Sequence, residues 1–368
     1  MILLVTGGAG FIGSHFIRLV LNQRPDWKVI NLDKLTYSGN LESLRDVEEN
    51  EGGRRYFFVK GDICDASLVA SLFSGGHSLF GRHSALAPEE SDGRPINAVV
   101  HFAAESHVDR SILDASAFFR TNVEGTRILI EAARRHWDVT RGTADRVSCR
   151  FVHVSTDEVY GSLGPSDPPF GEEDPVRPNS PYAASKAASD LAVLSYTHTY
   201  GFPSLVTRCG NNYGPYQHPE KFIPLFITNA LENRPLPLYG DGLQVRDWIH
   251  VEDHCRALMA LLERGKVGEV YNIGAGEERS NLQVAEFIVR TLGKSRDLVR
   301  RVADRAGHDR RYALDVTKLK SLLGWKAEQS FAEGLQTTIR WYQEHEMWWK
   351  RIKNDEFWKY YQEAYGPI

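Results

Sequence analysis

The sequence contains little cysteine, and its few cysteines are far apart. Only four occur in 368 residues, and no two of them form a Cys-x-x-Cys pair; they are Cys64, Cys149, Cys209 and Cys255. This spacing disfavours a structural zinc site and a disulfide framework, and it is typical of a reducing compartment. We therefore expect no bound metal and a cytoplasmic protein.

The sequence also lacks long apolar runs and a large net charge. The apolar run at the start of the chain stops at Gly7, whereas a signal peptide needs a longer run behind positive charge. No segment approaches the ~20 apolar residues of a membrane-spanning helix. The formal net charge is −4, which favours neither nucleic acid nor an anionic membrane as a partner. An anionic small molecule would have to be bound by individual Arg and Lys side chains.

Short apolar runs are present instead, and they alternate with segments of helical spacing. The runs cover residues 2–5, 29–32, 56–59, 98–102 and 151–154. Brief apolar runs are typical of parallel strands that are buried on both faces. Their alternation with helical patterns predicts a doubly wound parallel α/β sheet.

The composition of the chain changes near residue 210, where prolines become frequent. We expect residues 1–210 to form the first domain, together with a returning segment near 249–272. Residues 211–368 are then expected to form mainly a smaller mixed α/β domain that binds the substrate. Helices are predicted over 316–323 and 331–345. The tail beyond them is rich in tryptophan, which indicates packing or a subunit contact.

Two segments are predicted to be surface insertions. Residues 74–97 are rich in Gly, Ser and charge and precede the fourth predicted strand. Residues 138–148 form a second such stretch. An effect of either segment on assembly stays open.

A glycine-rich segment follows the first predicted strand and directly precedes a helical pattern. It reads Gly7-Gly8-Ala9-Gly10-Phe11-Ile12-Gly13. Glycines at this spacing allow a tight turn and a close approach of the backbone to a pyrophosphate, which then lies on the helix N-terminus. In this context the motif predicts a dinucleotide site in a Rossmann-type sheet.

An acidic residue, Asp33, ends the second predicted strand about 20 residues after the last glycine. A carboxylate at this place binds the ribose hydroxyls and repels a 2′-phosphate, so it favours NAD over NADP. The alternative is an acid that only caps a turn at the strand end. Asp62 and Ile63 follow the third strand, where we expect the adenine.

A tyrosine and a lysine are four residues apart at the start of a predicted helix. Tyr182 and Lys186 therefore share one helix face. A nearby ammonium group and a nicotinamide cation lower the pKa of a tyrosine, which can then accept a proton while hydride leaves the substrate. Such a pair is often only a solvated helix face. The glycine motif and Ser155-Thr156 at the end of the fifth strand favour the catalytic interpretation.

Together these motifs resemble the extended short-chain dehydrogenase/reductase family, and within it the dehydratases of dTDP-glucose. The likeness extends along nearly the whole chain. It is carried by Leu32-Asp33-Lys34-Leu35-Thr36-Tyr37, Ala103-Ala104-Glu105-Ser106-His107-Val108-Asp109-Arg110-Ser111, Thr156-Asp157-Glu158-Val159-Tyr160-Gly161, Asn211-Asn212-Tyr213-Gly214-Pro215, Arg246-Asp247-Trp248 and Asp304-Arg305-Ala306-Gly307-His308-Asp309-Arg310-Arg311-Tyr312. The resemblance implies an NAD-dependent hydro-lyase in deoxysugar (rhamnose-type) biosynthesis.

The resemblance also implies a role for each residue of Thr156-Asp157-Glu158. Oxidation at sugar C4 makes the C5 proton acidic, and loss of water across C5–C6 then needs a base and an acid. Glu158 is implied as the base, Asp157 as the acid, and Thr156 as a partner of the C4 hydroxyl beside Tyr182. Hydride then returns to C6, so NAD is regenerated in each turnover. Without the resemblance, the two acids would be interpreted as surface residues of a turn.

The resemblance assigns two further sets of residues. The cofactor is implied to contact Gly7, Gly10, Phe11, Ile12, Gly13, Asp33, Lys34, Thr36, Asp62, Ile63, Ala103, Ala104, Ser106, Thr121, Tyr182, Lys186 and Asn212. The nucleotide sugar is implied to contact His107, Asn211, Lys221, Phe222, Pro237, Tyr239, Arg246, Asn281, Arg305, His308 and Tyr312. Each arginine taken alone is also compatible with a solvated surface residue. One departure from the family pattern is Ala306, where proline is usual.

Three alternative functions stay open. A 4-epimerase shares the fold and the Tyr–Lys pair, but typically has small neutral residues at Asp157 and Glu158. A decarboxylase usually has serine in place of Asp157. A redox-sensing regulator tends to lose the tyrosine or the lysine.

Neither the nucleobase nor the oligomeric state is determined by the sequence. Thymine and uracil differ by one methyl group, which is worth only ~1–3 kcal/mol in a pocket. The predicted apolar helices over 117–136 and 182–200 are compatible with pairing between two copies, as in dimers of the family, so the resemblance implies a homodimer.

Overall fold

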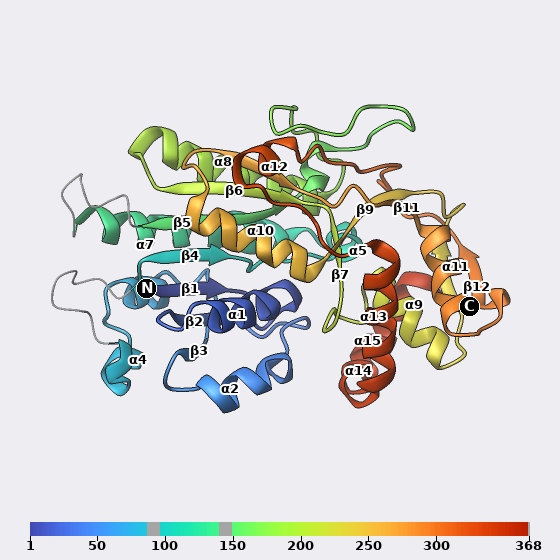
Figure 1. Ribbon diagram of the computed structural model, residues 1–368, viewed down its shortest axis with the longest axis horizontal. Helices are drawn as coiled ribbons and strands as arrows, with labels where there is room; N and C mark the ends of the chain where they lie inside the picture. Colours follow the sequence, from blue (N-terminus) through green and yellow to red (C-terminus); the bar gives the residue numbers. More distant parts are fainter. Residues whose placement is uncertain (87–95, 140–148, 367–368) are drawn as a thin grey trace.

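Seven parallel strands form the central sheet of the structure, a computed structural model that describes residues 1–86, 96–139 and 149–366 (Figure 1). Their order is β10-β6-β5-β4-β1-β2-β3. Their bounds are β1 (Ile2–Thr6), β2 (Lys28–Asp33), β3 (Tyr56–Lys60), β4 (Ala98–His101), β5 (Arg150–Thr156), β6 (Ser204–Cys209) and β10 (Val270–Ile273). The strand order changes direction between β1 and β4, and ligands bind at the carboxyl ends of strands at such a point.

Helices cover both faces of this sheet, and further helices are found in the second half of the chain. They are α1 (Phe11–Gln23), α2 (Arg45–Glu51), α3 (Ala66–Phe73), α4 (Ser78–Arg82), α5 (Val108–Leu113), α6 (Ser116–Phe118), α7 (Thr126–Val139), α8 (Pro181–Tyr200), α9 (Phe222–Leu231), α10 (Val251–Arg264), α11 (Asn281–Thr291), α12 (Thr317–Leu323), α13 (Phe331–Glu344), α14 (Glu346–Ile352) and α15 (Asp355–Tyr365). α1 packs against α10, and α7 packs against α3 and α8.

Side chains of the central strands alternate between two hydrophobic clusters. In β1, Leu3 packs with Phe16 of α1 on one face, and Leu4 packs with Leu129 of α7 on the other. Burial on both faces explains why the first five strands appear in the sequence as continuous apolar runs. The predicted Rossmann-type sheet is confirmed, with strand ends that differ by at most two residues.

Two predicted helices have different outcomes. The helix predicted over 182–200 is α8, which begins after Ser180, whose side chain accepts a hydrogen bond from the Ala183 N–H at 3.1 Å. It ends before Gly201, which has a φ of 62°. The helix predicted over 117–136 is instead divided into α6, the π-helical segment η3 (Phe119–Gly125) and α7.

The segment 74–97 is more than a surface insertion, and this part of the prediction was wrong. It contains α4 and the 3-10 turn η2 (Ser84–Leu86), and its apolar side chains Leu79, Leu86 and Ile96 are buried in the core cluster of α3 and α7. These apolar residues gain more by leaving water than by forming an exposed loop. Residues 87–95 of this segment, and 140–148 of the second predicted insertion, lie outside the described residues.

Two small sheets and the helices α9, α11, α13, α14 and α15 form the second part of the structure. One sheet has the order β11-β9-β7, with β7 (Asn211–Tyr213), β9 (Val245–His250) and β11 (Glu278–Ser280); the other pairs β8 (Leu236–Tyr239) with β12 (Val299–Val302). A third cluster joins them to α9, α11 and α13. The predicted packing of the tail is confirmed, because Trp348 and Trp349 of α14 are buried in this cluster.

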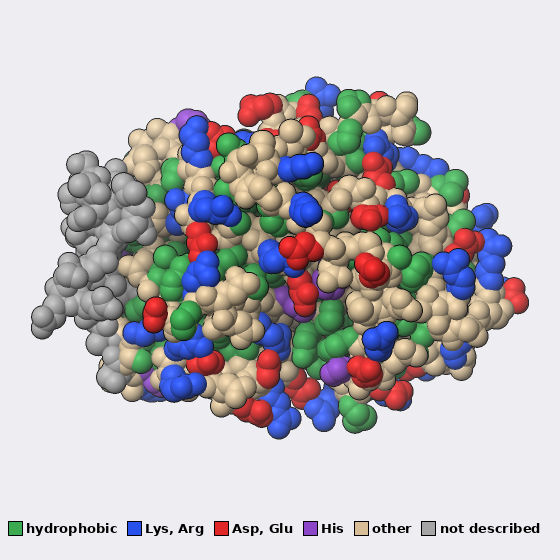
Figure 2. All heavy atoms as spheres, in the orientation of Figure 1, with side chains coloured by type: hydrophobic (Ala, Val, Ile, Leu, Met, Phe, Trp, Pro, Cys, Tyr) green, Lys and Arg blue, Asp and Glu red, His purple; other side chains and the backbone are tan. Residues whose placement is uncertain are grey.

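The surface carries charges of both signs. Figure 2 shows Lys and Arg interspersed with Asp and Glu over the face that it presents. Within the described ranges, no helix has both the length and the apolar character needed to cross a membrane.

Candidate functional site

The glycine-rich turn between β1 and α1 is closely packed against the strand-end backbone of β4. Gly7 has a φ of +72°, and a Cβ atom there would lie 2.6 Å from the backbone N of Ala103. A Cβ atom on Gly13 would lie 2.4 Å from the carbonyl oxygen of Gly7. Gly10 caps α1 without a side-chain hydrogen bond among the residues described, so the first N–H groups of the helix face the turn. This arrangement is suited to binding a pyrophosphate.

Asp33 ends β2 beside this turn. Its two carboxylate oxygens accept hydrogen bonds from the backbone N–H groups of Ala9, at 2.9 Å, and Leu35, at 2.8 Å. Burial raises the pKa of Asp33, and these two hydrogen bonds oppose the increase. Asp33 is therefore held in place at the strand end, where ribose hydroxyls bind in sheets of this type. Next to Asp33 in sequence, Lys34 forms an ion pair of 2.8 Å with Asp62.

One cavity of about 310 Å³ is lined by both the predicted cofactor residues and the predicted catalytic residues. Every predicted cofactor residue lines it, namely Gly7, Gly10, Phe11, Ile12, Gly13, Asp33, Lys34, Thr36, Asp62, Ile63, Ala103, Ala104, Ser106, Thr121, Tyr182, Lys186 and Asn212. The other three predicted catalytic residues, Thr156, Asp157 and Glu158, line the same cavity. Strand-end backbone and acid–base side chains thus share a single space.

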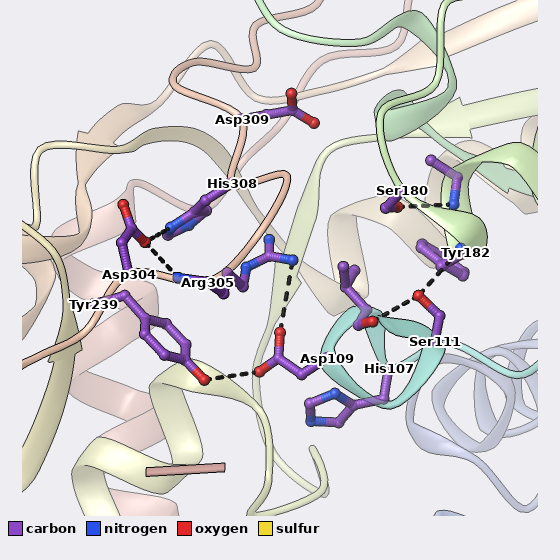
Figure 3. Close-up of polar contacts among 12 residues, drawn as sticks. His107, Asp109, Ser111, Ser180, Tyr182, Tyr239, Asp304, Arg305, His308 and Asp309 are labelled. Atoms are coloured by element: carbon purple, nitrogen blue, oxygen red, sulfur yellow. Dashed lines mark hydrogen bonds and ion pairs between the residues drawn. The ribbon is translucent and has the colours of Figure 1, made fainter. Parts of the chain in front are cut away.

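Tyr182 and Lys186 enter this cavity from the first turns of α8. The backbone N–H of Tyr182 donates to Ser111 Oγ at 3.2 Å, which ties α8 to α5 (Figure 3). Burial raises the pKa of Tyr182 well above its usual range, and the nearby charge of Glu158 adds to the increase. Lys186 Nζ donates to the carbonyl oxygen of Val154 at 2.8 Å. Burial lowers the pKa of Lys186 to about 8, which leaves an ammonium group at neutral pH.

Two carboxyl groups follow at the end of β5, in the 3-10 turn η5 (Asp157–Tyr160). Thr156 begins this turn, and its Oγ1 accepts from the Glu158 N–H at 3.3 Å. Burial and then the charge of Glu158 raise the pKa of Asp157 well above its usual range. Burial also raises the pKa of Glu158, but Arg305, Arg246 and Lys221 oppose that increase. Three cations thus oppose the increase at Glu158, whereas Arg246 is the one cation that opposes it at Asp157, and this difference favours Asp157 as the acid and Glu158 as the base.

Positive side chains from separate segments approach Glu158. Lys221 lines the cavity and donates to the carbonyl oxygen of Ser106 at 2.6 Å. Arg246 is 5% exposed, and its guanidinium group stacks over the ring of Tyr312 at 4.3 Å. Asn211 also lines the cavity. The fold thereby brings five of the predicted substrate residues toward the two carboxyl groups, namely Asn211, Lys221, Arg246, Arg305 and Tyr312.

Arg305 is held across the cleft by Asp109 of α5. Its Nη1 atom lies 3.6 Å from Asp109 Oδ1, and the hydroxyl of Tyr239 donates to Asp109 Oδ2 at 3.1 Å (Figure 3). His308 lies beside them and contacts Asp304, with 2.6 Å between Nδ1 and Oδ1. These contacts connect α5 to the loop 304–309 and to β8.

Of the predicted substrate residues, Asn211 and Lys221 line the cavity, and the other nine do not. Four of these nine have contacts elsewhere in the structure. His107 packs edge-on against Tyr360 of α15, with ring centroids 5.3 Å apart. Phe222 packs against Phe226 and Trp248 in the third hydrophobic cluster. Pro237 lies within β8, and Asn281 begins α11, where its N–H donates to the carbonyl oxygen of Gln244 at 3.0 Å. Their contacts with a substrate stay predictions.

Several residues of the cavity wall were not predicted. They are Leu32, Ser38, Gly39, Gly61, Phe102, Glu105, Val154, Ser155, Cys209, Gly210, Gln217 and His218. Leu32, Phe102 and Val154 lie at or just beyond strand ends, next to residues that were predicted. The rule that ligands bind at the carboxyl ends of parallel strands could have identified these three. No comparable signal marks Gln217 and His218, which reach the site through the turn after β7.

Comparisons with known proteins give consistent matches. The model of the NAD dependent epimerase/dehydratase family matches residues 3–274. A dTDP-glucose 4,6-dehydratase of Streptomyces niveus is 48% identical over 360 residues, covering 97% of this chain and 97% of the relative. One from Neisseria meningitidis serogroup B is 46% identical over 366 residues and covers 96% and 97%. The crystal structure of DesIV, a dTDP-glucose 4,6-dehydratase from Streptomyces venezuelae with NAD and dTDP bound, has a TM-score of 0.84 at 49% identity, covering 96% of this chain and all of that one.

Proposed function

This chain belongs to the NAD dependent epimerase/dehydratase family, and from this membership and its site we infer that it is a nucleotide-sugar 4,6-dehydratase. The reaction converts dTDP-glucose to dTDP-4-keto-6-deoxyglucose. The observation that carries this conclusion is the presence of two adjacent acids, the buried Asp157 and the half-buried Glu158, in the same cavity as Tyr182 and Lys186. A Tyr–Lys pair supports oxidation and reduction, whereas loss of water needs the additional acid and base.

The cofactor is NAD, and the turn between β1 and α1 fits its pyrophosphate. Gly7 and Gly13 leave room where any Cβ atom would collide with backbone, and the open N-terminus of α1 faces the same space. The carboxylate of Asp33 provides acceptors for the ribose hydroxyls and repels a 2′-phosphate. Bound NAD takes a hydride from sugar C4 and returns it to C6, so the cofactor is unchanged after each cycle.

The protein side chains move the protons of this reaction. Tyr182 accepts the proton of the C4 hydroxyl, with the positive charge of Lys186 favouring the ionised form of the tyrosine and Thr156 helping to hold the hydroxyl. Glu158 removes the C5 proton, and Asp157 donates a proton to the departing C6 hydroxyl, which leaves as water. Glu158 then returns a proton to C5. Tyr182 releases the proton taken from the C4 hydroxyl to solvent, and Asp157 takes one up from solvent, so each side chain ends the cycle in its starting form. The product keeps the C4 ketone, so atoms and electrons balance: one water is lost.

The positive side chains around Glu158 are suited to the diphosphate of the substrate. We assign Arg246 and Arg305 to the phosphates, because arginine can bind them in a bidentate manner. Asn211 and Lys221 then hold the sugar–phosphate end. The further contacts proposed for this part of the molecule, which is mainly 211–368, are His107, Phe222, Pro237, Tyr239, Asn281, His308 and Tyr312.

The acid pair also argues against the related activities. An epimerase needs no base at C5, and a decarboxylase of the family usually has serine where Asp157 stands. A regulator that only senses NAD would have no use for an acid pair beside Tyr182. The described part of the chain retains all five side chains in one cavity.

We further propose that the protein is a cytoplasmic homodimer. Several large apolar side chains are exposed on α5, η3 and α8, among them Leu113, which is 69% exposed, and Leu191, which is 56% exposed. An apolar surface of this kind is suited to pairing with a second copy. A monomeric mass in light scattering at working concentration would contradict the dimer.

The test is incubation of the purified protein with dTDP-glucose and, separately, with UDP-glucose, without added NAD, followed by mass spectrometry. We expect a product lighter by one water, with dTDP-glucose preferred, and no such product from Glu158→Gln. A product of unchanged mass with the galactose configuration would instead establish an epimerase. No reaction, even after NAD is added, would contradict the proposed activity.

A further inference from the structure

A buried ion pair lies directly behind the catalytic residues of α8. Asp190 follows Lys186 by one helical turn, and its side chain is fully buried. Arg208 of β6 donates from Nε to Asp190 Oδ2 at 3.0 Å, and its side chain is only 4% exposed. Neither residue lines the cavity, so neither has a place in the reaction described above.

The same arginine also contacts the turn that carries the acid and the base. The guanidinium group of Arg208 lies 4.6 Å from the ring centroid of Tyr160, the last residue of η5. The hydroxyl of Tyr160 donates to Asn272 Oδ1 of β10 at 2.8 Å. Through Arg208, the helix that carries Tyr182 and Lys186 is therefore connected to the turn that carries Asp157 and Glu158.

The surroundings keep Asp190 and Arg208 ionised. Burial alone would raise the pKa of Asp190, but His153 and Arg208 outweigh it and hold the pKa below its usual range. His153 Nε2 lies 3.4 Å from Asp190 Oδ1 and 3.1 Å from Ser189 Oγ. Burial lowers the pKa of His153 to about 4, so this imidazole is neutral at working pH.

Stability alone is a poor explanation for such a pair. The desolvation cost of two buried charges roughly cancels their attraction, and apolar residues of similar volume often give equal or greater stability. Position and electrostatics are the properties that only the ionised pair supplies at this site.

We propose that Asp190 and Arg208 are positioning residues. They keep Lys186 charged, and they fix the position of the Tyr–Lys pair relative to the acid pair so that both can act on the same sugar. This inference rests on the proposed function, because only a reaction that combines oxidation with loss of water needs both pairs at once. Asp190 acts on Lys186 along α8, and Arg208 acts on η5 through Tyr160.

The charge of Lys186 depends on groups from every element around it. Asp190 of α8 and Cys209 of β6 raise its pKa, against the larger effect of burial. His101 of β4 and His153 of β5 also lie within electrostatic range of Lys186. Both imidazoles are neutral, because burial lowers their pKa. Without the carboxylate of Asp190, the positive Arg208 would be left uncompensated, and Lys186 would lose its proton at a lower pH.

The experiment uses Asp190→Asn, which keeps the shape and removes the charge, and Arg208→Lys, which keeps a charge and loses the contact with Tyr160. We expect Asp190→Asn to move the alkaline limb of the pH profile of kcat to lower pH by about one unit. We expect Arg208→Lys to leave that limb in place and to slow solvent deuterium incorporation at C5 by about tenfold relative to NADH formation in a single turnover.

The matched control is Asp253→Asn, because Asp253 of α10 is also fully buried in an ion pair, with Arg256, away from the cavity. It should lower thermal stability and leave the alkaline limb unchanged. An unchanged limb in Asp190→Asn, or an equal shift in Asp253→Asn, would overturn the inference.

A second measurement does not depend on activity. In protein labelled with 13C-lysine, the Lys186 signal, assigned with Lys186→Arg, should titrate near the value of about 8. It should titrate lower in Asp190→Asn. If the wild type does not convert dTDP-glucose, the proposed function fails, while this titration still decides the role of Asp190; a Lys186 signal that titrates above pH 10 would overturn it.

Discussion

The two sides of the cavity are built in different ways. On the cofactor side, the ligand-facing groups are backbone atoms and small residues at the ends of β1, β2 and β4, fixed by the hydrogen bonds of the sheet. On the nucleotide side, long charged side chains come from separate loops and helices, and they are oriented by one another. Arg305 depends on Asp109, and Arg246 on Tyr312.

This difference predicts where the site tolerates change. A backbone cradle depends on the absence of side chains and binds through many small contacts, so single polar substitutions beside it have limited effects. A site of converging cations depends on a few strong charge-assisted contacts. The residues between the two sides, to which we assign the proton transfers, should be the least tolerant of all.

The largest expected effect belongs to the junction of the two sides. Tyr182→Phe removes the hydroxyl that accepts the C4 proton, so we expect kcat to fall by about 1000-fold. The cofactor cradle is not altered, and the amount of NAD that copurifies should stay the same. Product formation by mass spectrometry and NAD content by chromatography measure the two quantities. Activity within tenfold of the wild type would remove Tyr182 from the mechanism.

The next effect tests the nucleotide side alone. Arg246→Met removes a charged partner of the diphosphate, and we expect KM to rise about ten- to hundredfold with NAD content unchanged. Arg300→Met, at an exposed arginine of β12, is the control and should leave KM unchanged. A loss of NAD in Arg246→Met would show that the two sides are not separable.

The same variant has an expected pH dependence. Burial raises the pKa of Glu158, and Arg305, Arg246 and Lys221 oppose that increase. The base works in its ionised form, so activity falls as pH falls through this pKa. Loss of Arg246 should raise the pKa further and move the acidic limb of kcat/KM to higher pH. A limb at the wild-type position would contradict the coupling between Arg246 and Glu158.

A smaller effect is expected on the cofactor side. Asp33→Asn keeps an acceptor for one of the two N–H groups of Ala9 and Leu35, but loses the second acceptor and the negative charge. We expect NAD affinity to fall by about tenfold and the preference over NADP to narrow, because the repulsion of the 2′-phosphate is lost. Titration of cofactor-stripped protein with both dinucleotides measures this. An unchanged preference would assign Asp33 to turn capping only.

The smallest effect is expected at the contact across the cleft. Asp109→Asn removes the charge that competes with a phosphate for Arg305, so we expect dTDP to bind about threefold more tightly. Isothermal titration calorimetry with dTDP decides the direction. Weaker binding would show that Asp109 orients Arg305 for the ligand and does not compete for it.

The same contrast explains what the sequence could predict. The cofactor residues form contiguous motifs at strand ends, and all of those predicted line the cavity. Asp157 and Glu158 were identified from their place after the fifth strand together with the family resemblance. The assignment of Arg246, Arg305 and Lys221 to the substrate came from the resemblance. Their convergence on Glu158 was not predicted, since no local pattern brings residues so far apart in sequence together.

The parts that escaped prediction depend on tertiary contacts. The π-helical segment η3 interrupts an apolar helical pattern that gives no local sign of a break. The outward packing of His107 is determined by Tyr360, which lies 253 residues later in the chain. Cys209 and His218 reach the cavity wall only because of where β6 and the turn after β7 end. Information of this kind is present in the whole fold and in no single segment.

The crowding at Gly7 and Gly13 has a genetic consequence. Every single-base change of a glycine codon that alters the protein gives either a stop codon or a residue with a Cβ atom. At Gly7 that atom would lie 2.6 Å from a backbone nitrogen, and at Gly13 it would lie 2.4 Å from a carbonyl oxygen. These two codons thus have no neutral neighbour one step away among the changes that alter the protein. Descendants of this gene can diversify the nucleotide side by ordinary drift, while this turn is inherited unchanged.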